Sequence, residues 1–411
     1  MMNSYKIQKY QHKISTYNGQ TVPEIYYNKL SYYTNLIYGG KTKLAQPKSD
    51  KNCDSKTFIL DNNHISACGY GLLTDAGTKS KLEPVVFDRR LPYDTDVVIQ
   101  ILYCGVCHSD WHSIIGEWSR KIPLIPGHEI AGQVIKIGTA VNKFKIGDSV
   151  GVGPYVNSCQ QCARCLEQNQ QYCINGTSST YDSRDRIPGS LKPDGERTYG
   201  GFSNIITVNQ DFVFKIPSNL PLDQAAPLLC AGVTVYSPLI RSGVGPGKKV
   251  AIAGIGGLGS VAVKIAKALG AEVLAITRTD WKLTDAKRIG ADKTVLVKDM
   301  AMYNDTLDVI IDTIPEIHNI NPYLDLLKFD GSMTIVGVFD NVDLDTSVLS
   351  SGRKAIRGSI VGGVREFKDL LQFCSKHNIV ADIEKIKIKD INSTFKKIQN
   401  SKVKYRFVIE M

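Results

Sequence analysis

The chain has 411 residues, which is too long for one hydrophobic core of ordinary size, so we expect two domains with separate cores. Hydrophobic residues make up 43% and charged residues 22%, which argues against a mostly disordered, fibrous or membrane-spanning molecule. The formal net charge is +10, but residues 1–56 carry nine lysines against three acidic residues and supply +6 of it. Because the basic excess lies mostly in that segment, no nucleic-acid partner is expected.

Targeting and membrane signals are weak in this sequence. The most apolar long stretch, residues 225–240, contains two prolines and falls short of the roughly 20 residues that cross a bilayer, so no membrane span is expected. The first thirty residues lack the apolar core of a secretory signal, and residues 1–56 lack the arginines of a transit peptide. We therefore expect a cytoplasmic protein, whose ten cysteines favour metal ligation over disulfides.

Residues 1–63 are predicted to be an N-terminal extension, rich in Tyr, Asn and Lys and with little apolar periodicity. A disordered tail is one interpretation of it. Eight tyrosines between Tyr5 and Tyr38 leave a short helix or a docking strip open as another.

The pattern of apolar residues changes along the rest of the chain. Residues 64–214 contain short β-rich segments between Gly and Pro turns, which predicts an all-β or α+β module. From Lys249 onward, strands alternate with helices, which predicts a parallel sheet with helices on both faces and an α/β fold class. The expected elements lie at residues 250–253, 258–269, 272–277, 308–312 and 333–338. After about Ile360 the pattern turns irregular, and it ends in a strand-like stretch at residues 405–409.

Four cysteines form the pattern C-x2-C-x2-C-x7-C in a polar, turn-rich stretch: Cys159, Cys162, Cys165 and Cys173. Two-residue gaps let a loop fold around an ion at about 2.3 Å from each sulfur, and four thiolates close a tetrahedron without a position for water. The pattern predicts a structural zinc. A reducing compartment disfavours disulfides, and an iron–sulfur cluster normally has its fourth cysteine nearer, often followed by proline.

A second set of metal-binding residue types lies upstream, in CGVCHSDWH (104–112) and PGHEIAG (126–132). Alone these strings are weak evidence, because Cys104 and Cys107 also fit a redox pair or ordinary buried thiols. Together with the four-cysteine loop, APLLCAG (226–232), GGVREF and the terminal YRFVIE, they resemble the zinc-containing medium-chain alcohol dehydrogenases. The resemblance runs from about residue 64 to the C-terminus and is nearest to the cinnamyl alcohol dehydrogenase-like, NADP-preferring branch.

The resemblance implies a domain arrangement. Residues 64–230 and 361–411 would form a β-rich GroES-like catalytic domain that holds both zinc sites. Residues 231–360 would form a Rossmann dinucleotide-binding domain with a doubly wound parallel sheet. Family members are commonly dimers or tetramers, which implies a homodimer.

The resemblance also assigns the metal ligands. It implies that Cys107, His128 and Cys230 bind a catalytic zinc and leave a fourth position open for water or substrate. With the structural site, this makes two zinc ions per chain. Asp110 would orient the His128 ring as a carboxylate behind the ligand, and Glu129 would lie behind the metal.

Three further residues acquire roles from the same comparison. The proton of the alcohol would pass through Ser109 to His112 at the surface, while His108 would lie near the cofactor phosphates. A helix cap for Ser109 and a surface imidazole for His112 are the alternatives. Trp118 would line the substrate pocket, although a role in the core is also open for it.

Residues 248–269 read KKVAIAGIGGLGSVAVKIAKAL, a strand followed by a G-x-G-x-x-G turn and a helix. Glycines let the backbone approach a pyrophosphate, and the helix N-terminus offers free amides and a positive dipole. The glycine pattern alone also fits a tight turn, but its position between strand and helix predicts a dinucleotide site. The residues expected to form it are Gly254, Gly256, Gly257, Leu258 and Gly259.

The end of the following strand bears on the choice of dinucleotide. An NAD enzyme usually has Asp or Glu there to bind the ribose hydroxyls, and that carboxylate would repel a 2′-phosphate. Here the position is Thr277, followed by Arg278 and, one turn further, Lys282. This pattern favours NADP, whereas the nearby Asp280 and the option of a plain surface arginine keep NAD open.

We therefore expect a zinc-dependent oxidoreductase that moves hydride between NADP(H) and a small alcohol or aldehyde, with aldehyde reduction as the expected direction. Within the enzyme class the alternative is an NAD-linked alcohol or polyol dehydrogenase. Outside it the alternative is a catalytically silent relative that acts as a binding module. The presence of every implied ligand and relay residue argues against that silent relative.

Overall fold

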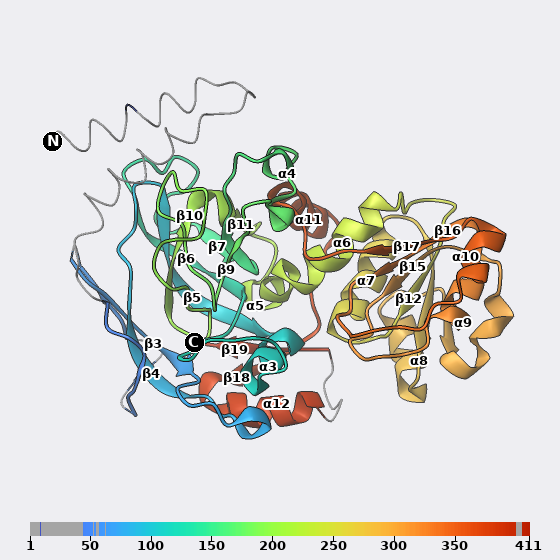
Figure 1. The fold of residues 1–411 in the computed structure, drawn as a ribbon, viewed down its shortest axis with the longest axis horizontal. Coiled ribbons are helices and arrows are strands. Elements are labelled where there is room, and N and C mark those ends of the chain that lie inside the picture. Colours follow the sequence, from blue (N-terminus) through green and yellow to red (C-terminus); the bar gives the residue numbers. More distant parts are fainter. Residues whose placement is uncertain (1–8, 10–43, 52, 55–56, 62, 400–404) are drawn as a thin grey trace. The chain divides into compact units, whose positions relative to one another are not determined.

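The protein is described by a computed structural model, which covers residues 9, 44–51, 53–54, 57–61, 63–399 and 405–411. The described chain packs as two compact units (Figure 1). Of the described residues, those up to 218, 385–399 and 407–411 belong to the first unit, and residues 219–384 and 405–406 belong to the second. The interpretations of the first part of the extension lie outside the described residues. Within the described ranges, no helix combines the length and the apolar character needed to cross a bilayer.

A sheet of seven described strands forms the centre of the first unit, with the order β11-β7-β6-β5-β19-β18 and β10 as a further partner of β5. The long β5 contains Val97, Val98 and Ile99, which are completely buried, and it pairs antiparallel with β6, β10 and β19. Its strands are β5 (Asp96–Val106), β6 (Glu129–Ile137), β7 (Ser149–Val152), β10 (Ile205–Asn209), β11 (Phe214–Lys215), β18 (Ile383–Lys387) and β19 (Arg406–Glu410). Further strands and α-helices of this unit are β8 (Tyr155–Asn157), β9 (Ser178–Ser179), α3 (His108–Ile115), α4 (Ala163–Leu166) and α12 (Ile391–Gln399).

A second, four-stranded sheet of the first unit contains part of the predicted extension. Its order is β1-β4-β3-β2, with β1 (Lys48–Ser49), β2 (Ile59–Leu60), β3 (Ile65–Gly71) and β4 (Glu83–Arg89). The Ala45 amide donates to the Asp88 carboxylate at 2.8 Å, and the Tyr199 hydroxyl donates to Gln46 at 3.0 Å. β1 and β2 therefore dock at the two edges of this sheet, which backbone pairing permits without apolar periodicity.

The second unit is built on a six-stranded sheet with the order β14-β13-β12-β15-β16-β17, in which every neighbouring pair is parallel. This confirms the predicted α/β class and parallel sheet. Its strands are β12 (Lys249–Ala253), β13 (Glu272–Thr277), β14 (Lys293–Leu296), β15 (Leu307–Asp312), β16 (Leu327–Ile335) and β17 (Ala355–Gly358). Its helices are α5 (Leu222–Ala225), α6 (Ala231–Arg241), α7 (Gly257–Ala268), α8 (Asp280–Arg288), α9 (Asn321–Asp325), α10 (Thr346–Gly352) and α11 (Val364–His377).

The irregular pattern expected after Ile360 was wrong for α11. This helix has 14 residues, and Glu366 in its first turn accepts the Gly363 amide at 2.8 Å, which closes its N-terminus. Its buried residues recur with helical spacing and form one apolar stripe: Val364, Phe367, Leu370, Leu371 and Cys374. This helical periodicity was visible in the sequence, although no helix was predicted there.

The compact units differ from the expected domains, because residues 219–230 and 361–384 pack with the parallel sheet's unit. The Ser237 hydroxyl of α6 donates to Glu366 of α11 at 3.1 Å, and both helices lie in that unit. These units describe packing, and the functional domain boundaries stay a prediction.

Leu370→Ala should destabilise the second unit, because Leu370 is completely buried in the apolar stripe of α11. We expect a loss of about 2–5 kcal/mol in the free energy of unfolding, from lost burial and the cavity left behind. Urea denaturation followed by circular dichroism measures it, with the exposed Lys368→Ala of the same helix as the control. Equal midpoints for the two variants would contradict the packing of this helix.

Candidate active site and metal centres

The turn from β5 into α3 positions the first group of candidate residues. Cys107 is the N-cap of α3, and the Asp110 carboxylate Oδ2 accepts the Cys107 amide at 3.0 Å. This reciprocal cap fixes the backbone at the thiol, because the carboxylate pairs with an amide that the helix itself leaves unpaired. Ser109 is thus the second residue of the helix and is not its cap.

The same carboxylate joins α3 to the PGHEIAG segment. Asp110 Oδ1 accepts the Gly127 amide at 3.0 Å and lies 3.1 Å from His128 Nδ1. Asp110 is fully buried and His128 is 5% exposed. Burial alone would lower the pKa of His128, but the charge and hydrogen bond of Asp110 together with those of Cys107 raise this pKa well above its usual value.

The sequence-predicted residues Cys107, His128 and Glu129 come together in the first unit. Each offers one ligand atom, and these atoms lie within 4.8 Å of one another in buried surroundings. Thiolate, imidazole and carboxylate are all donors that zinc accepts, so the residues fit such an ion. Cys230 belongs to the second unit, where it is buried and is the N-cap residue of α6.

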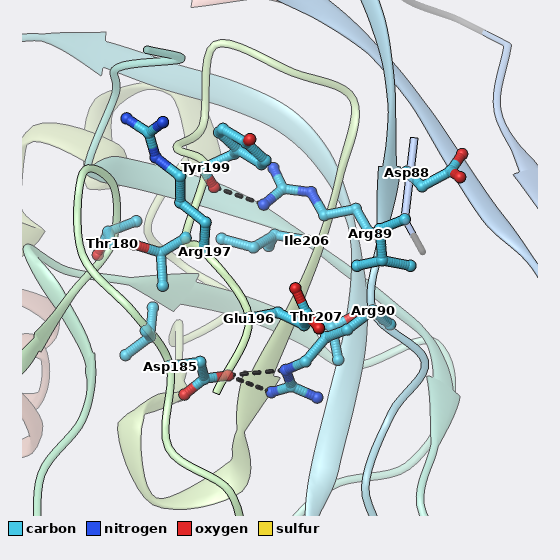
Figure 2. Close-up of a pocket in the computed structure, with 13 residues that line it drawn as sticks. Asp88, Arg89, Arg90, Thr180, Asp185, Glu196, Arg197, Tyr199, Ile206 and Thr207 are labelled. Carbon is cyan, nitrogen blue, oxygen red and sulfur yellow. Dashed lines mark hydrogen bonds and ion pairs between the residues drawn. The ribbon is translucent and has the colours of Figure 1, made fainter. Parts of the chain in front are cut away.

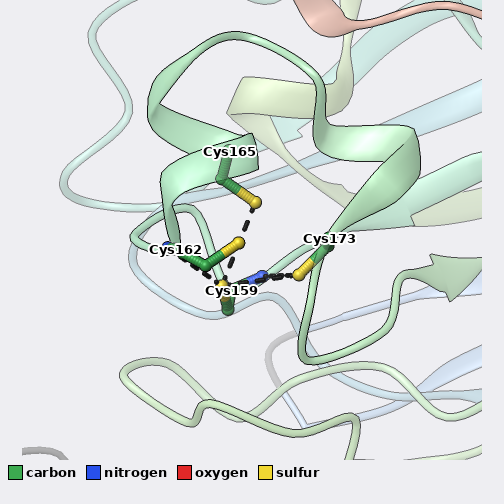
Figure 3. A group of neighbouring side chains, drawn as sticks. All are labelled: Cys159, Cys162, Cys165 and Cys173. Carbon is green, nitrogen blue, oxygen red and sulfur yellow. Dashed lines mark hydrogen bonds between the residues drawn. The ribbon is translucent and has the colours of Figure 1, made fainter.

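The four-cysteine loop gathers its sulfurs around one centre, as Figure 3 shows. The Cys159 sulfur lies 3.4 Å from that of Cys173 and 3.9 Å from that of Cys165. These separations exceed the roughly 2 Å of a disulfide and are close to the edge of about 3.8 Å in a tetrahedron with 2.3 Å metal–sulfur bonds. The Cys162 amide donates to the Cys159 sulfur at 3.4 Å, which favours a thiolate there. The donor set is closed and fits a structural zinc.

The proposed relay residues lie on one helix, but the structure gives them different neighbours. His112 Nδ1 contacts the Glu117 carboxylate, and the His112 ring lies 4.8 Å from that of His108 and stacks on Trp118 at 5.1 Å, measured between centroids. Trp118 is 36% exposed, so it does not belong to the core of its unit. For Ser109, the described residues provide no hydrogen bond to the hydroxyl.

Tyr181 is a residue of this region that the sequence did not reveal. Its ring lies 5.9 Å from that of His128, and its hydroxyl lies 3.4 Å from the Ser113 hydroxyl. Burial raises the pKa of Tyr181 well above its usual value, and the Asp110 charge adds to this. Tyr181 is therefore a neutral aromatic wall beside the candidate ligand. It lies 53 residues beyond His128 in the chain, and no local pattern pointed to it.

A hollow elsewhere in the first unit is lined by β4, β10 and residues 180–199, and it contains none of the metal-ligand residues (Figure 2). Its arginines are bound to neighbouring carboxylates and backbone carbonyls. Arg90 Nε donates to Asp185 at 2.8 Å, and the same guanidinium contacts Asp96. Arg89 donates to the Gly200 carbonyl at 2.9 Å. These contacts hold residues 180–200 against β4 and the residue that follows it. We therefore interpret the hollow as a structural feature of the first unit.

The glycine turn of the second unit has the backbone that a pyrophosphate site requires. Gly254 has φ +84°, which favours glycine, and a Cβ added at Gly259 would lie 1.9 Å from the Gly254 carbonyl oxygen. At Gly256 an added Cβ would meet nothing within 4 Å, so the turn presents open backbone there. α7 begins at Gly257 without a side-chain cap, and its first amides are available to an anion.

Arg406 is a second residue that the sequence analysis missed. A Cβ added at Gly257 would lie 3.1 Å from both Nε and Cζ of this guanidinium. Arg406 is 6% exposed, so a buried cation stands beside the helix terminus proposed for the pyrophosphate. The sequence did offer a sign of it, because Arg406 is the one charged residue within the apolar, strand-like run at residues 405–409.

The residues expected to select the dinucleotide lie at the end of β13 and directly after it. Thr277 is buried, and its hydroxyl accepts the Thr279 amide at 3.2 Å. Arg278 is exposed and forms an ion pair with Glu316, a residue that the sequence analysis did not consider. Burial and the nearby Arg278 lower the pKa of Lys282.

Comparison with known proteins places this geometry in a family. Residues 93–218 match the model of the alcohol dehydrogenase GroES-like domain, and residues 257–376 match that of the zinc-binding dehydrogenase. The chain is 43% identical, over 99% of its length and 97% of the relative's, to a probable zinc-type alcohol dehydrogenase-like protein, L498, of Acanthamoeba polyphaga mimivirus. The chain is a zinc-type medium-chain alcohol dehydrogenase.

Two further similarities specify the branch of this alcohol dehydrogenase. Cinnamyl alcohol dehydrogenase 3 of Arabidopsis thaliana is 43% identical over 86% of this chain and 93% of the relative. The structure of CAD from Helicobacter pylori complexed with NADP(H) superposes with a TM-score of 0.78 at 40% identity, covering 85% of this chain and 99% of that one. The enzyme thus belongs to the cinnamyl alcohol dehydrogenase-like branch. The viral relative also aligns with most of the extension.

Asp110→Asn should impair this dehydrogenase more than its isosteric shape suggests, because an amide cannot accept from two backbone amides and also carry the charge that faces His128. We expect activity to fall about 10- to 100-fold, the usual effect of removing the group that orients a metal-binding histidine. Steady-state kinetics measure it. Asp148→Asn, which alters a carboxylate bound to a backbone amide and Lys215 in the same unit, is the control. A variant as active as the control would refute the orienting role.

Proposed function

We propose that this alcohol dehydrogenase transfers hydride between NADP(H) and a small alcohol or aldehyde, with aldehyde reduction as its working direction. The observation that carries the proposal is the buried Asp110 carboxylate, which binds the Cys107 amide and faces His128 Nδ1. Since Nδ1 faces this carboxylate, Nε2 is the ring nitrogen left for a metal ion. NADP(H) as the cofactor is supported by the related Helicobacter pylori protein, which was solved with it.

The catalytic centre in this proposal uses Cys107, His128 and Cys230 as ligands, the last assigned by the resemblance alone. A bound zinc ion supplies Lewis acidity, which polarises a carbonyl oxygen and favours the deprotonated form of an alcohol. The protein's own contribution is orientation, because the buried Asp110 fixes the ring of His128 and the backbone of Cys107. Glu129, a buried member of the same group, would lie behind the metal. Tyr181 and Trp118 would provide aromatic walls for the substrate.

The proton in this proposal travels along α3. In alcohol oxidation the Ser109 hydroxyl accepts the proton of the substrate hydroxyl and passes one on toward the His112 imidazole. The Glu117 carboxylate contacts His112 Nδ1 and thereby orients the ring. In aldehyde reduction the proton moves in the opposite direction. His108, beside His112, would face the cofactor phosphates.

The cofactor in this proposal lies along the carboxyl edge of the parallel sheet. Its pyrophosphate would meet the glycine turn and the first amides of α7, while Arg278 and Lys282 would meet the 2′-phosphate. A homodimer and a cytoplasmic location complete the proposal, and both rest on the sequence and the resemblance.

Metal analysis tests the proposed two centres. Purified protein should contain two zinc ions per chain, and Cys165→Ala should retain one, because three thiolates no longer close the structural tetrahedron. Cys374→Ala removes a buried cysteine outside both groups and should retain two. Elemental analysis gives the ratio directly. A single zinc ion per chain in the parent protein would mean that one of the two proposed sites, catalytic or structural, does not hold an ion.

Arg278→Ala tests the cofactor assignment. Loss of the guanidinium should raise the Michaelis constant for NADPH about tenfold, since charge-assisted contacts with phosphate are among the stronger hydrogen bonds. The constant for NADH, which has no 2′-phosphate, should change less than about twofold. Aldehyde reduction followed by the absorbance of the reduced cofactor measures both constants. Equal effects on the two cofactors would refute the assignment.

A further inference from the structure

An ion pair crosses the edge of the parallel sheet where a dinucleotide is expected. Arg278 follows β13, Glu316 follows β15, and Arg278 Nη2 lies 2.9 Å from Glu316 Oε2. Strand β12 lies between these two strands in the sheet. The pair therefore spans the carboxyl end of β12, from which the glycine turn starts. In open parallel sheets, ligands bind in the crevice outside the carboxyl ends of the strands.

The loop that carries Glu316 is tied to the core of its unit. The His318 ring contacts the Glu316 carbonyl at 2.8 Å through Nδ1 and lies 3.2 Å from Asp312 through Nε2. Asp312 is completely buried at the end of β15, and its other oxygen accepts the Ile314 amide at 3.1 Å. These contacts fix the backbone at Glu316. Its side chain remains 63% exposed, and that of Arg278 70% exposed.

We propose that Glu316 is a cofactor-specificity residue of this dehydrogenase, an inference that rests on the proposed use of Arg278 for the 2′-phosphate. The carboxylate holds the guanidinium when no phosphate is present and repels a phosphate that approaches it. NADP(H) must displace Glu316 to reach Arg278, whereas NAD(H) leaves the ion pair in place. The preference for NADP(H) is therefore smaller than Arg278 alone would produce.

The size of the effect follows from the exposure of the pair. Both side chains are more than half exposed, so water and salt screen their attraction. Removing the carboxylate should tighten NADPH binding about two- to fivefold, the range of an exposed ion pair. Near 1 M salt, where the Debye length is about 3 Å, most of the gain should vanish.

Glu316→Gln tests the proposal, because glutamine keeps the shape of the side chain and loses its charge. NADPH and NADH are titrated separately by their fluorescence in the absence of substrate, at low and high salt. The variant should bind NADPH about two- to fivefold more tightly than the parent and NADH with unchanged affinity. Glu272→Gln is the matched control, since Glu272 forms an exposed ion pair with Lys293 at 2.8 Å at the opposite, amino end of the sheet. It should change neither affinity.

Arg278→Ala in the same titration separates two kinds of failure. If Glu316→Gln leaves NADPH binding unchanged or weakens it while Arg278→Ala weakens it, the role of Glu316 is overturned and the proposed cofactor assignment stands. If Arg278→Ala also leaves NADPH binding unchanged, the cofactor assignment itself fails. Equal tightening of NADPH and NADH by Glu316→Gln would indicate a general charge effect and would overturn the specificity role.

Discussion

One buried carboxylate determines the geometry of the candidate active site. Asp110 accepts the amides of Cys107 and Gly127 and faces the ring of His128, so a single side chain aligns two segments of the first unit. A fully buried charge is unfavourable unless it is paired and hydrogen-bonded. Two amides and an imidazole supply that pairing, and the need for it fixes α3 against the PGHEIAG segment. The ligand geometry therefore depends on satisfying Asp110.

The two candidate metal-ligand groups differ in what surrounds their donors. In the four-cysteine loop the donors are alike, and one short stretch of chain supplies them all, with backbone amides donating to the Cys159 sulfur and to the Cys173 sulfur. The loop is also fastened by Arg186, which donates to the Asn175 carbonyl at 3.0 Å. The group around His128 combines sulfur, nitrogen and carboxylate donors from separated stretches. A local, uniform set suits a permanent ion, whereas a mixed set anchored by Asp110 suits an ion that exchanges its remaining ligand.

The sequence could predict what depends on local spacing. The cysteine pattern and the glycine turn are each specified within about twenty residues, and the parallel sheet follows from the alternation of strands and helices. Tyr181 and Glu316 could not be found in this way, because they reach their neighbours only after distant strands have paired. The pairing of β1 and β2 was equally hidden, since edge strands use backbone hydrogen bonds that leave no pattern in side chains. The missed helix α11 is different, because its apolar stripe was visible in the sequence.

The cofactor edge illustrates why a local motif does not determine specificity. Thr277 ends one strand, Arg278 follows it, and together they are typical of a phosphate site. The charge at that edge, however, is the sum of contributions from neighbouring loops. Glu316 enters from the far side of β12 and offsets the arginine. Arg406 adds a buried cation near Gly257, at the other end of the glycine turn. Parallel strands bring the ends of separate βα units to one edge, so the electrostatic character of the edge belongs to the whole sheet.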